Sequence, residues 1–424
     1  MASTSSGART DEIARGVSFS ASVRLSFSAS PGLTFTGPGA SMRVLLALEP
    51  GGRGDLSRQL EEILSAMQAK LEKVPKPVAI IMLTIFLRDP GDLKECKRML
   101  AAHYGPEPPV TSYVFQPPCS GAALAIEVCA VGGGSVSAER FGARTLALSC
   151  DGARQVYYAG AAPEGAGSAY GQTLHALEEM RLALKAAGTG FENVVRTWFY
   201  LGGITERESG TDRYRELNRA RTDFYRDIRF RPSQGRWTES AFPSSTCIGA
   251  EGSGLAAGCF TFETKRKEVL LLPLENPLQT PAYSYRSAYS AQSPKFSRAM
   301  SLVLGGRVTA WVSGTASIVD SESRHHGDAE RQTMQTIDNI ERLVSGENFS
   351  SHGVTGVNGS LGDFRGIRVY IKRPEDFMRC KAVCESRFGP VPAIYAVADV
   401  CRPELLVEIE GVASFTRSRG ASGE

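Results

Sequence analysis

The amino-acid sequence predicts an α/β (α+β) fold made of three repeats of one unit on a single chain. Three segments show the same order of a helical stretch, a β-rich run, a second helix and a closing strand. In each helix the apolar residues recur at spacings of three and four, and each strand is rich in β-branched or aromatic residues. These periodicities predict three mixed sheets, each backed by helices.

The elements of each repeat follow from these patterns. In the first repeat we expect helices at residues 55–71 and 93–103, and strands at 79–93 and 123–131. In the second repeat we expect helices at 170–188 and 212–225, and strands at 194–204 and 259–264. In the third repeat we expect helices at 331–344 and 377–387, and strands at 367–377 and 405–415.

The repeats also set the expected domain boundaries. The three units are expected at residues 17–133, 134–265 and 280–416, with a linker at 266–279. Residues 1–16 read as a disordered lead-in without an apolar signal core, and residues 417–424 as a disordered tail.

Composition and charge exclude several classes of function. The chain has 424 residues with a net charge of only +3 and no basic block, so nucleic acid is not an expected partner. The longest apolar run, residues 78–87, is about half the ~20 residues of a membrane-spanning helix. The nine cysteines form no CxxC pair, so we expect no metal site, no disulfides and a cytoplasmic location. The glycines at 132–134 lack the context of a nucleotide-binding loop, and no cofactor is expected.

Three stretches resemble the Rid/YjgF family, whose small α/β (chorismate-mutase-like) domains form trimers with active sites between subunits. They are VVRTWFYL, FPSSTCIGA and LLVEIEGVA, and they resemble that family's strand, loop and terminal strand at residues 194–201, 242–250 and 405–413. The resemblance implies that the three repeats form a pseudo-trimer within one monomeric chain. It also implies that divergence leaves one chemically competent cleft.

Two family positions indicate which cleft that is. Rid enzymes that hydrolyse imines use an Arg, but Ser245 and Ile394 stand at the matching places, and the first repeat has no Arg there. Imine deamination is therefore not expected. The family's Glu on the final strand is retained only in the third repeat, as Glu408; the first repeat has Ala125 there and the second a non-acidic residue.

Residues 140–415 resemble the chorismatases, enzymes that remove pyruvate from chorismate. The stretches that carry the resemblance lie at residues 275–300, 311–332, 336–354, 369–376 and 398–411. One departure is that the family's YGP is Tyr289-Ser290-Ala291 here. Residues 1–139 match less well. The resemblance implies that chorismate is the substrate and 3-hydroxybenzoate the product.

Glu408 is the expected general acid. It follows Leu405, Leu406 and Val407 on the final strand, and burial beside apolar residues raises a carboxyl pKa toward neutrality. By alternation it shares a strand face with Glu410, which we interpret as structural. The competing explanation is that both are solvent-facing acids on an edge strand.

The family resemblance assigns further residues. Cys401 and Gly314 match the pair that marks 3-hydroxybenzoate-forming members, whereas Ala at both places marks members that stop at the dihydrodiol. Cys401 is grouped with Glu408 as catalytic. The expected substrate-binding residues are Arg221, Tyr285, Gly314, Arg298 and Gln332. Each of them also has an ordinary structural explanation, such as core packing or solvation.

Three other functions stay open on sequence alone. They are a chorismate hydrolase that gives the dihydrodiol, a Rid-type hydrolase of another enol ether or imine, and a metabolite-binding or protein-interaction module. His325 and His326 are interpreted as residues that order a loop, because no set of carboxylate ligands accompanies them.

Overall fold

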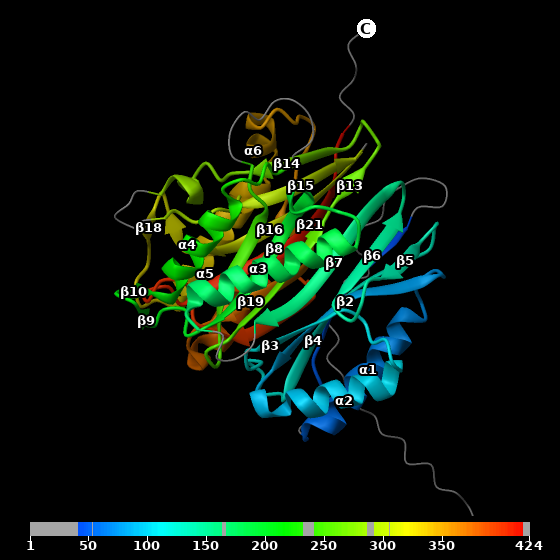
Figure 1. Ribbon diagram of the computed structural model, residues 1–424. Helices are drawn as coiled ribbons and strands as arrows, with labels where there is room; N and C mark the ends of the chain where they lie inside the picture. The colour runs from blue at the N-terminus through cyan, green and yellow to red at the C-terminus, as the bar shows by residue number, and fades with distance from the viewer. Residues whose placement is uncertain are drawn as a thin grey trace, which may run out of the picture.

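The computed structural model describes residues 41–52, 54–162, 167–231, 241–285, 292–304 and 306–418. The predicted lead-in at 1–16, residues 419–424 of the predicted tail and the altered Tyr289-Ser290-Ala291 turn lie outside these residues. Within them the chain forms three main sheets with helices packed against each (Figure 1). The predicted mixed α+β fold is confirmed.

The first unit is a four-stranded sheet in the order β1-β4-β2-β3. Its elements are β1 (Met42–Leu48), α1 (Leu56–Leu71), β2 (Val78–Leu87), α2 (Leu93–Tyr104), β3 (Thr111–Phe115) and β4 (Leu124–Gly132). The central strand β4 runs antiparallel to both neighbours, whereas β2 and β3 are parallel.

The second unit repeats this topology and adds strands at one edge, in the order β11-β8-β12-β7-β6-β5. Its main elements are β5 (Ser137–Arg140), β6 (Thr145–Cys150), β7 (Ala153–Ala162), α3 (Ala169–Ala186), β8 (Val194–Gly202), α4 (Arg213–Tyr225), β11 (Ser244–Ala250) and β12 (Leu255–Thr261). Short strands are β9 (Arg207–Glu208), β10 (Thr211–Asp212) and β13 (Glu263–Thr264). The parallel pair here is β8 and β11.

The third unit follows the same plan in the order β14-β15-β16-β21-β19-β20. Its main elements are β14 (Leu270–Leu274), β15 (Ala299–Leu304), β16 (Arg307–Ala316), α5 (Ala329–Val344), α6 (Gly346–Ser351), β19 (Phe364–Ile371), α7 (Phe377–Phe388), β20 (Ala393–Val397) and β21 (Val407–Thr416). A small hairpin consists of β17 (Ile318–Val319) and β18 (Glu322–Ser323). Here β19 and β20 are the parallel pair.

The long helices start where a side chain caps the first turn. Asp55, Ser168, Asp212 and Asp328 each accept a hydrogen bond from a backbone amide three residues further on. These bonds satisfy amides that a helix leaves free at its N-terminus. The short side chains, rather than the apolar spacing alone, therefore fix the start of each helix.

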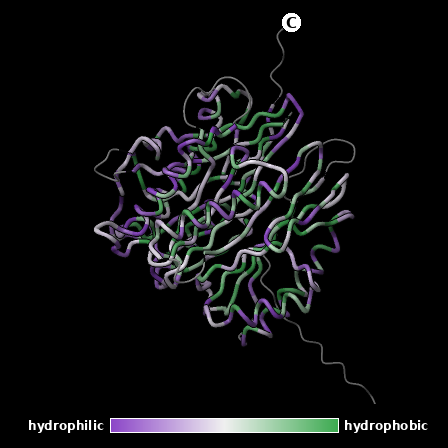
Figure 2. The backbone as a smooth tube through the Cα atoms, viewed as in Figure 1, coloured by the Kyte–Doolittle hydropathy of each residue, from purple (hydrophilic) through white to green (hydrophobic). Residues whose placement is uncertain are grey.

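The three units pack around a shared apolar centre. Each sheet has its own core against its helices, while two further clusters combine residues of all three sheets. The edge strand of the parallel pair in each unit lies against the next unit: β3 against β7 and β12, β11 against β16, and β20 against β1 and β4. Figure 2 shows hydrophobic residues recurring along the strands in the interior of the molecule. The three units thus contact one another in a closed ring, which places two walls from different units around each cleft.

Some sequence expectations differ from the structure. The expected linker at 266–279 contains β14, which pairs with β15 and extends the third sheet. The stretch 242–250, compared above with a family loop, contains strand β11, and the strand expected at 259–264 begins at Leu255. The strand expected at 367–377 ends at Ile371. These boundaries depend on pairing with strands that are distant in the sequence, and such pairing cannot be predicted from local periodicity.

Candidate functional site

The central strand β21 carries the two acids of interest on its inner face. Glu408 lies opposite Tyr370 in the pairing with β19. In the first and second sheets the residues at this place, opposite Phe86 and Tyr200, are Ala125 and Ala256. Among the three central strands the acid at this position is therefore present only in the third unit, as the sequence predicted.

Glu410 is the ionised centre of a buried network that joins the three units. Its carboxylate accepts hydrogen bonds from Arg196, Thr246, Trp198, Tyr370 and Arg368. Burial alone would raise the pKa of Glu410, but the charges of Arg368 and Arg196 hold it below its usual value.

The same network reaches the first unit. Arg368 also forms an ion pair with Glu127 and donates a hydrogen bond to Thr84, both in the first sheet. The structural role predicted for Glu410 fits these contacts, because removing one partner of such a buried set leaves charges unpaired.

Glu408 lies in a contrasting environment two residues away. Its side chain is buried, and among the described residues no hydrogen bond reaches its carboxyl group. Burial, together with the negative charge of Glu410, raises the pKa of Glu408 to about 8, although Arg196 and Arg298 oppose the shift. The pKa values of two acids on the same strand face are thus shifted in opposite directions, and Glu408 is expected to hold its proton at neutral pH.

Gly314 on β16 makes room for this carboxyl group. A Cβ at position 314 would lie 2.0 Å from Oε1 of Glu408 and 3.2 Å from Cγ2 of Thr246. Any side chain at 314 must therefore displace the Glu408 carboxyl group from its present place.

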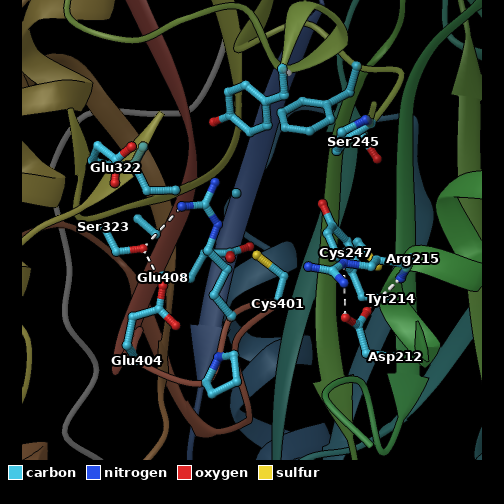
Figure 3. A pocket seen from close by; sticks show the side chains of 18 of the residues that line it. Asp212, Tyr214, Arg215, Ser245, Cys247, Glu322, Ser323, Cys401, Glu404 and Glu408 are labelled. Carbon is cyan, nitrogen blue, oxygen red and sulfur yellow. Dashed lines mark hydrogen bonds and ion pairs between the residues drawn. The ribbon is translucent and has the colours of Figure 1, made fainter. Parts of the chain in front are cut away.

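The Glu408 side chain faces a cavity of about 290 Å³ between the second and third units. One wall comes from α4 and β11, the other from β16, β21 and the loop before β21. In Figure 3, Glu408, Cys401 and Glu404 lie on one side, and Cys247, Tyr214 and Asp212 on the other. The capping Asp212 thus also lines the cavity.

Two arginines that line this cavity are buried outside any ion pair among the described residues, although the charge of Glu275 acts on Arg298 from beyond ion-pair distance. Arg221 is 1% exposed and Arg298 is 3% exposed, and among the described residues neither forms an ion pair with a carboxylate. Arg221 donates hydrogen bonds to Ser245 and Asn218, and Arg298 to Tyr285 and the carbonyl of Thr280.

Both guanidinium groups also keep an unused donor. The Nε atom of each arginine is buried without a hydrogen-bond partner among the described residues. Both groups lie near the ring of Phe296, at 5.7 Å for Arg221 and 5.4 Å for Arg298. Unpaired buried charge is costly, so this arrangement favours an anionic ligand that supplies the missing partner.

The cavity also holds two thiols that remain protonated. Burial, with the charge of Glu408 as a further cause, raises the pKa of Cys401 to about 12. Burial likewise raises the pKa of Cys247, on the opposite wall. A neutral thiol is a weak hydrogen-bond donor and a poor nucleophile, so Cys401 is placed to contact a ligand rather than to attack it.

Six of the seven predicted site residues line this cavity. They are Glu408, Cys401, Arg221, Tyr285, Gly314 and Arg298. Gln332 does not line it: its side-chain amide is buried, donates to the carbonyl groups of His325 and Glu404, and accepts from the amide of Leu406. Its place is behind the cavity wall, where it orders the segment that leads into β21.

Several lining residues were not predicted. Phe296, Arg402 and Glu404 lie within stretches that carried the family resemblance, so proximity to those motifs is the signal that could have found them. His326, interpreted as a loop-ordering residue, contacts the carbonyl of Ser323 and also lines the cavity. Tyr214 and Cys247 come from the opposite wall, which only the folded ring brings to Glu408.

Among the described residues, no group of three or more His, Cys, Asp or Glu side chains is arranged to hold a metal ion. None of the described helices has the length and apolar character needed to cross a membrane.

Comparison with known proteins gives this geometry its context. Residues 133–260 match the profile of the family described as chorismatase FkbO/Hyg5-like, N-terminal. A solved chorismatase structure superposes with a TM-score of 0.64 at 21% identity, over 88% of this chain and 98% of that one. The chain has the chorismatase fold. The resemblance expected from the sequence motifs is thereby confirmed.

Two curated relatives from Streptomyces hygroscopicus extend this resemblance to sequence. A 3-hydroxybenzoate synthase is 36% identical over 53% of this chain and 64% of its own length. A chorismatase is 33% identical over 53% of this chain and 62% of its own length. Both matches span less than two thirds of the relative.

Proposed function

We propose that the protein is a chorismatase that removes pyruvate from chorismate and forms 3-hydroxybenzoate. The observation that carries the proposal is Glu408, a buried carboxyl group that faces a cavity lined by two buried arginines, and whose pKa burial raises to about 8. The sequence similarity to a 3-hydroxybenzoate synthase and to chorismatases supports it.

Chorismate is a dianion, so its binding site must supply two cationic contacts. Arg221 and Arg298 provide planar guanidinium groups that suit carboxylates, and each has a free Nε donor among the described residues. Tyr285, held by Arg298, and Phe296 supply aromatic surface for the ring.

The chemistry begins with proton transfer from Glu408 to the terminal methylene carbon of the enolpyruvyl ether. The double bond gains the proton and an oxocarbenium centre forms, leaving Glu408 as a carboxylate. The oxygen of the neighbouring ring hydroxyl then bonds to the ring carbon that carries the ether, the ether C–O bond breaks, and pyruvate leaves. The three-membered ring formed in this step opens to 3-hydroxybenzoate, and the one proton lost returns to the Glu408 carboxylate. No water is consumed, whereas attack by water would consume one molecule and give the dihydrodiol.

A direct test is to incubate the purified full chain with chorismate and identify the products by mass spectrometry. We expect pyruvate and 3-hydroxybenzoate in equal amounts. Pyruvate with dihydrodiol would show that the protein uses the hydrolytic route and not the aromatising one. Unchanged chorismate would overturn the proposal.

The pH dependence of the reaction follows from the Glu408 pKa. Because the protonated form is the donor and its pKa is raised to about 8, kcat/KM should be level near neutrality and fall above about pH 8. The measurement is an initial-rate profile of pyruvate release from pH 6 to 10. A rate that rises across this range would contradict a protonated Glu408 as the donor.

The stability of the folded chain should also depend on the ionisation of Glu408. The pKa of Glu408 is higher in the folded than in the unfolded chain. The free energy of unfolding should therefore fall as pH rises from the unfolded pKa toward about 8. The Glu408→Gln variant lacks this loss and should have the higher Tm at pH 8. Equal pH dependence of Tm in both proteins would contradict the raised pKa.

Replacing Arg221 should separate binding from stability. Arg221→Gln removes a buried charge that has no acidic partner among the described residues, so we expect KM for chorismate to rise at least ~10-fold while Tm is unchanged or higher. The matched control is Arg213→Gln on the same helix, where Arg213 is buried but ion-paired with Glu208. The Tm of the control variant should fall. A similar fall in the Tm of Arg221→Gln would mean that Arg221 has a structural role.

We further propose that the enzyme acts as a cytoplasmic monomer with units at 17–133 and 134–265 and a third unit that ends at 416 and starts at β14, before the predicted residue 280. The ring of contacts among three units on one chain supports the monomer, and the thiols, free among the described residues, support a reducing compartment. Sedimentation equilibrium tests the first point, and fractionation of the source cells tests the second.

A further inference from the structure

A second cavity lies between the first and second units. Its volume is about 880 Å³, against about 290 Å³ for the cavity at Glu408. Its walls are α2 and β3 of the first unit and β7 and β12 of the second. In the repeat these correspond to α4, β11, β16 and β21, so the two cavities occupy equivalent clefts of the ring.

The second cavity lacks the group needed for the chemistry proposed above. The position equivalent to Glu408 is Ala256, which lines the cavity and offers no proton. The carboxyl group among its lining residues is that of Glu251, which follows β11 and lies outside the central strand. A ligand bound here is therefore not expected to be protonated as in the first cavity.

The charge around the second cavity is positive. Lys94 and Lys97 of α2 line it, against the single lining carboxyl group of Glu251; Arg144 of the second unit also lines it, but its charge is paired with Glu179. The ammonium group of Lys97 lies 5.1 Å from the centre of the Tyr113 ring. Cationic side chains around an apolar cleft attract anions and concentrate them there.

A buried polar atom at this cavity lacks a partner. Ser112 lines the cavity and is 6% exposed, and its Oγ atom has no hydrogen-bond partner among the described residues. Successive side chains of a strand point to opposite faces, so the Ser112 hydroxyl group lies on the face of β3 away from Tyr113 and is not counted among the ligand contacts.

The shape of the walls indicates a flat ligand. Small residues of β7 and β12, Gly160, Ala161 and Ala256 among them, form one wall. The rings of Tyr113 and Phe115 on β3 are part of the other. A smooth wall facing aromatic rings favours a planar apolar body, which stacks at little cost in conformational freedom.

We propose that the cleft between the first and second units binds a flat aromatic organic anion and does not transform it. The anionic group lies toward Lys94 and Lys97, and the ring lies between Tyr113 and the small residues of β7 and β12. This site is independent of chorismate turnover at Glu408.

The test uses 8-anilinonaphthalene-1-sulfonate, an aromatic anion whose fluorescence rises in apolar sites, as the reporter and 2-naphthoate, a flat aromatic anion, as its competitor. We expect saturable binding by the full chain and displacement by 2-naphthoate. The variant with both Lys94→Glu and Lys97→Glu should raise Kd at least ~10-fold. Both lysines are exposed, so folding should be unaffected.

Matched controls place the probe in one cavity. The exposed pair Lys265→Glu with Lys267→Glu changes the net charge equally but lines neither cavity, and it should leave Kd unchanged. Arg221→Gln alters the first cavity and should also leave Kd unchanged. Three results would each overturn the proposal: an equal rise of Kd in the two double-lysine variants, a rise of Kd in Arg221→Gln, or no saturable binding.

Discussion

Replacing Glu408 by Gln is expected to lower the rate of pyruvate release from chorismate by at least ~10²-fold. Gln keeps the size of the side chain but has no acidic proton, and the structure offers no hydrogen bond to the Glu408 carboxyl group that the change would disturb within the described residues. A loss of 10²-fold corresponds to about 2.7 kcal/mol of transition-state stabilisation. The measurement is kcat by a coupled pyruvate assay at pH 7.

The matched control is Glu404→Gln, a change of the same kind in the same cavity wall. Although partial burial alone would raise its pKa, hydrogen bonding to Ser323 and the charge of Arg402 hold the pKa of Glu404 below its usual value. Glu404 is therefore ionised near neutral pH and has no proton to give, so its loss should change kcat by less than ~10-fold. Equal losses in the two variants, or near-normal turnover in Glu408→Gln, would mean that the proton comes from elsewhere.

The sequence could predict Glu408 because its signal is local. Strand alternation, apolar neighbours and the family motif all fall within one stretch of the chain, and the three repeated units could likewise be found from periodicity. The opposite pKa shifts of Glu408 and Glu410 could not be predicted. Arg196, which pairs with Glu410, is 214 residues away in sequence, and only the ring of units brings the two together.

Gln332 shows the converse limit. Its helix and its closeness to a family motif suggested a ligand contact, but a side-chain amide also suits backbone groups. The loop before β21 has unpaired carbonyl and amide groups that Gln332 satisfies. Whether an amide serves a ligand or a loop depends on which loop packs beside it, and this is decided by tertiary structure.

Changing Cys401 and Gly314 together to Ala is expected to shift the main product from 3-hydroxybenzoate to the dihydrodiol. The sequence motif suggested this pair, and the geometry supplies a reason. A methyl group at position 314 would stand 2.0 Å from Oε1 of Glu408, so the carboxyl group must take a new position relative to the substrate. Loss of the Cys401 thiol removes a neutral group beside that same carboxyl group and leaves space that water can occupy.

A change of product requires little energy, because ~1.4 kcal/mol between the two routes is tenfold in their ratio. Product ratios measured by liquid chromatography for both single variants and the double variant would separate the contributions of the two substitutions to the change of product. Gly314→Ala alone should also slow pyruvate release, since it moves the proposed acid, whereas Cys401→Ala alone should not. The control is Cys247→Ala, which removes a thiol from the opposite wall and should leave the product unchanged. If the double variant still gives only 3-hydroxybenzoate, the choice of attacking group is made by other residues of the cavity, because both substitutions act at the carboxyl group that starts the reaction.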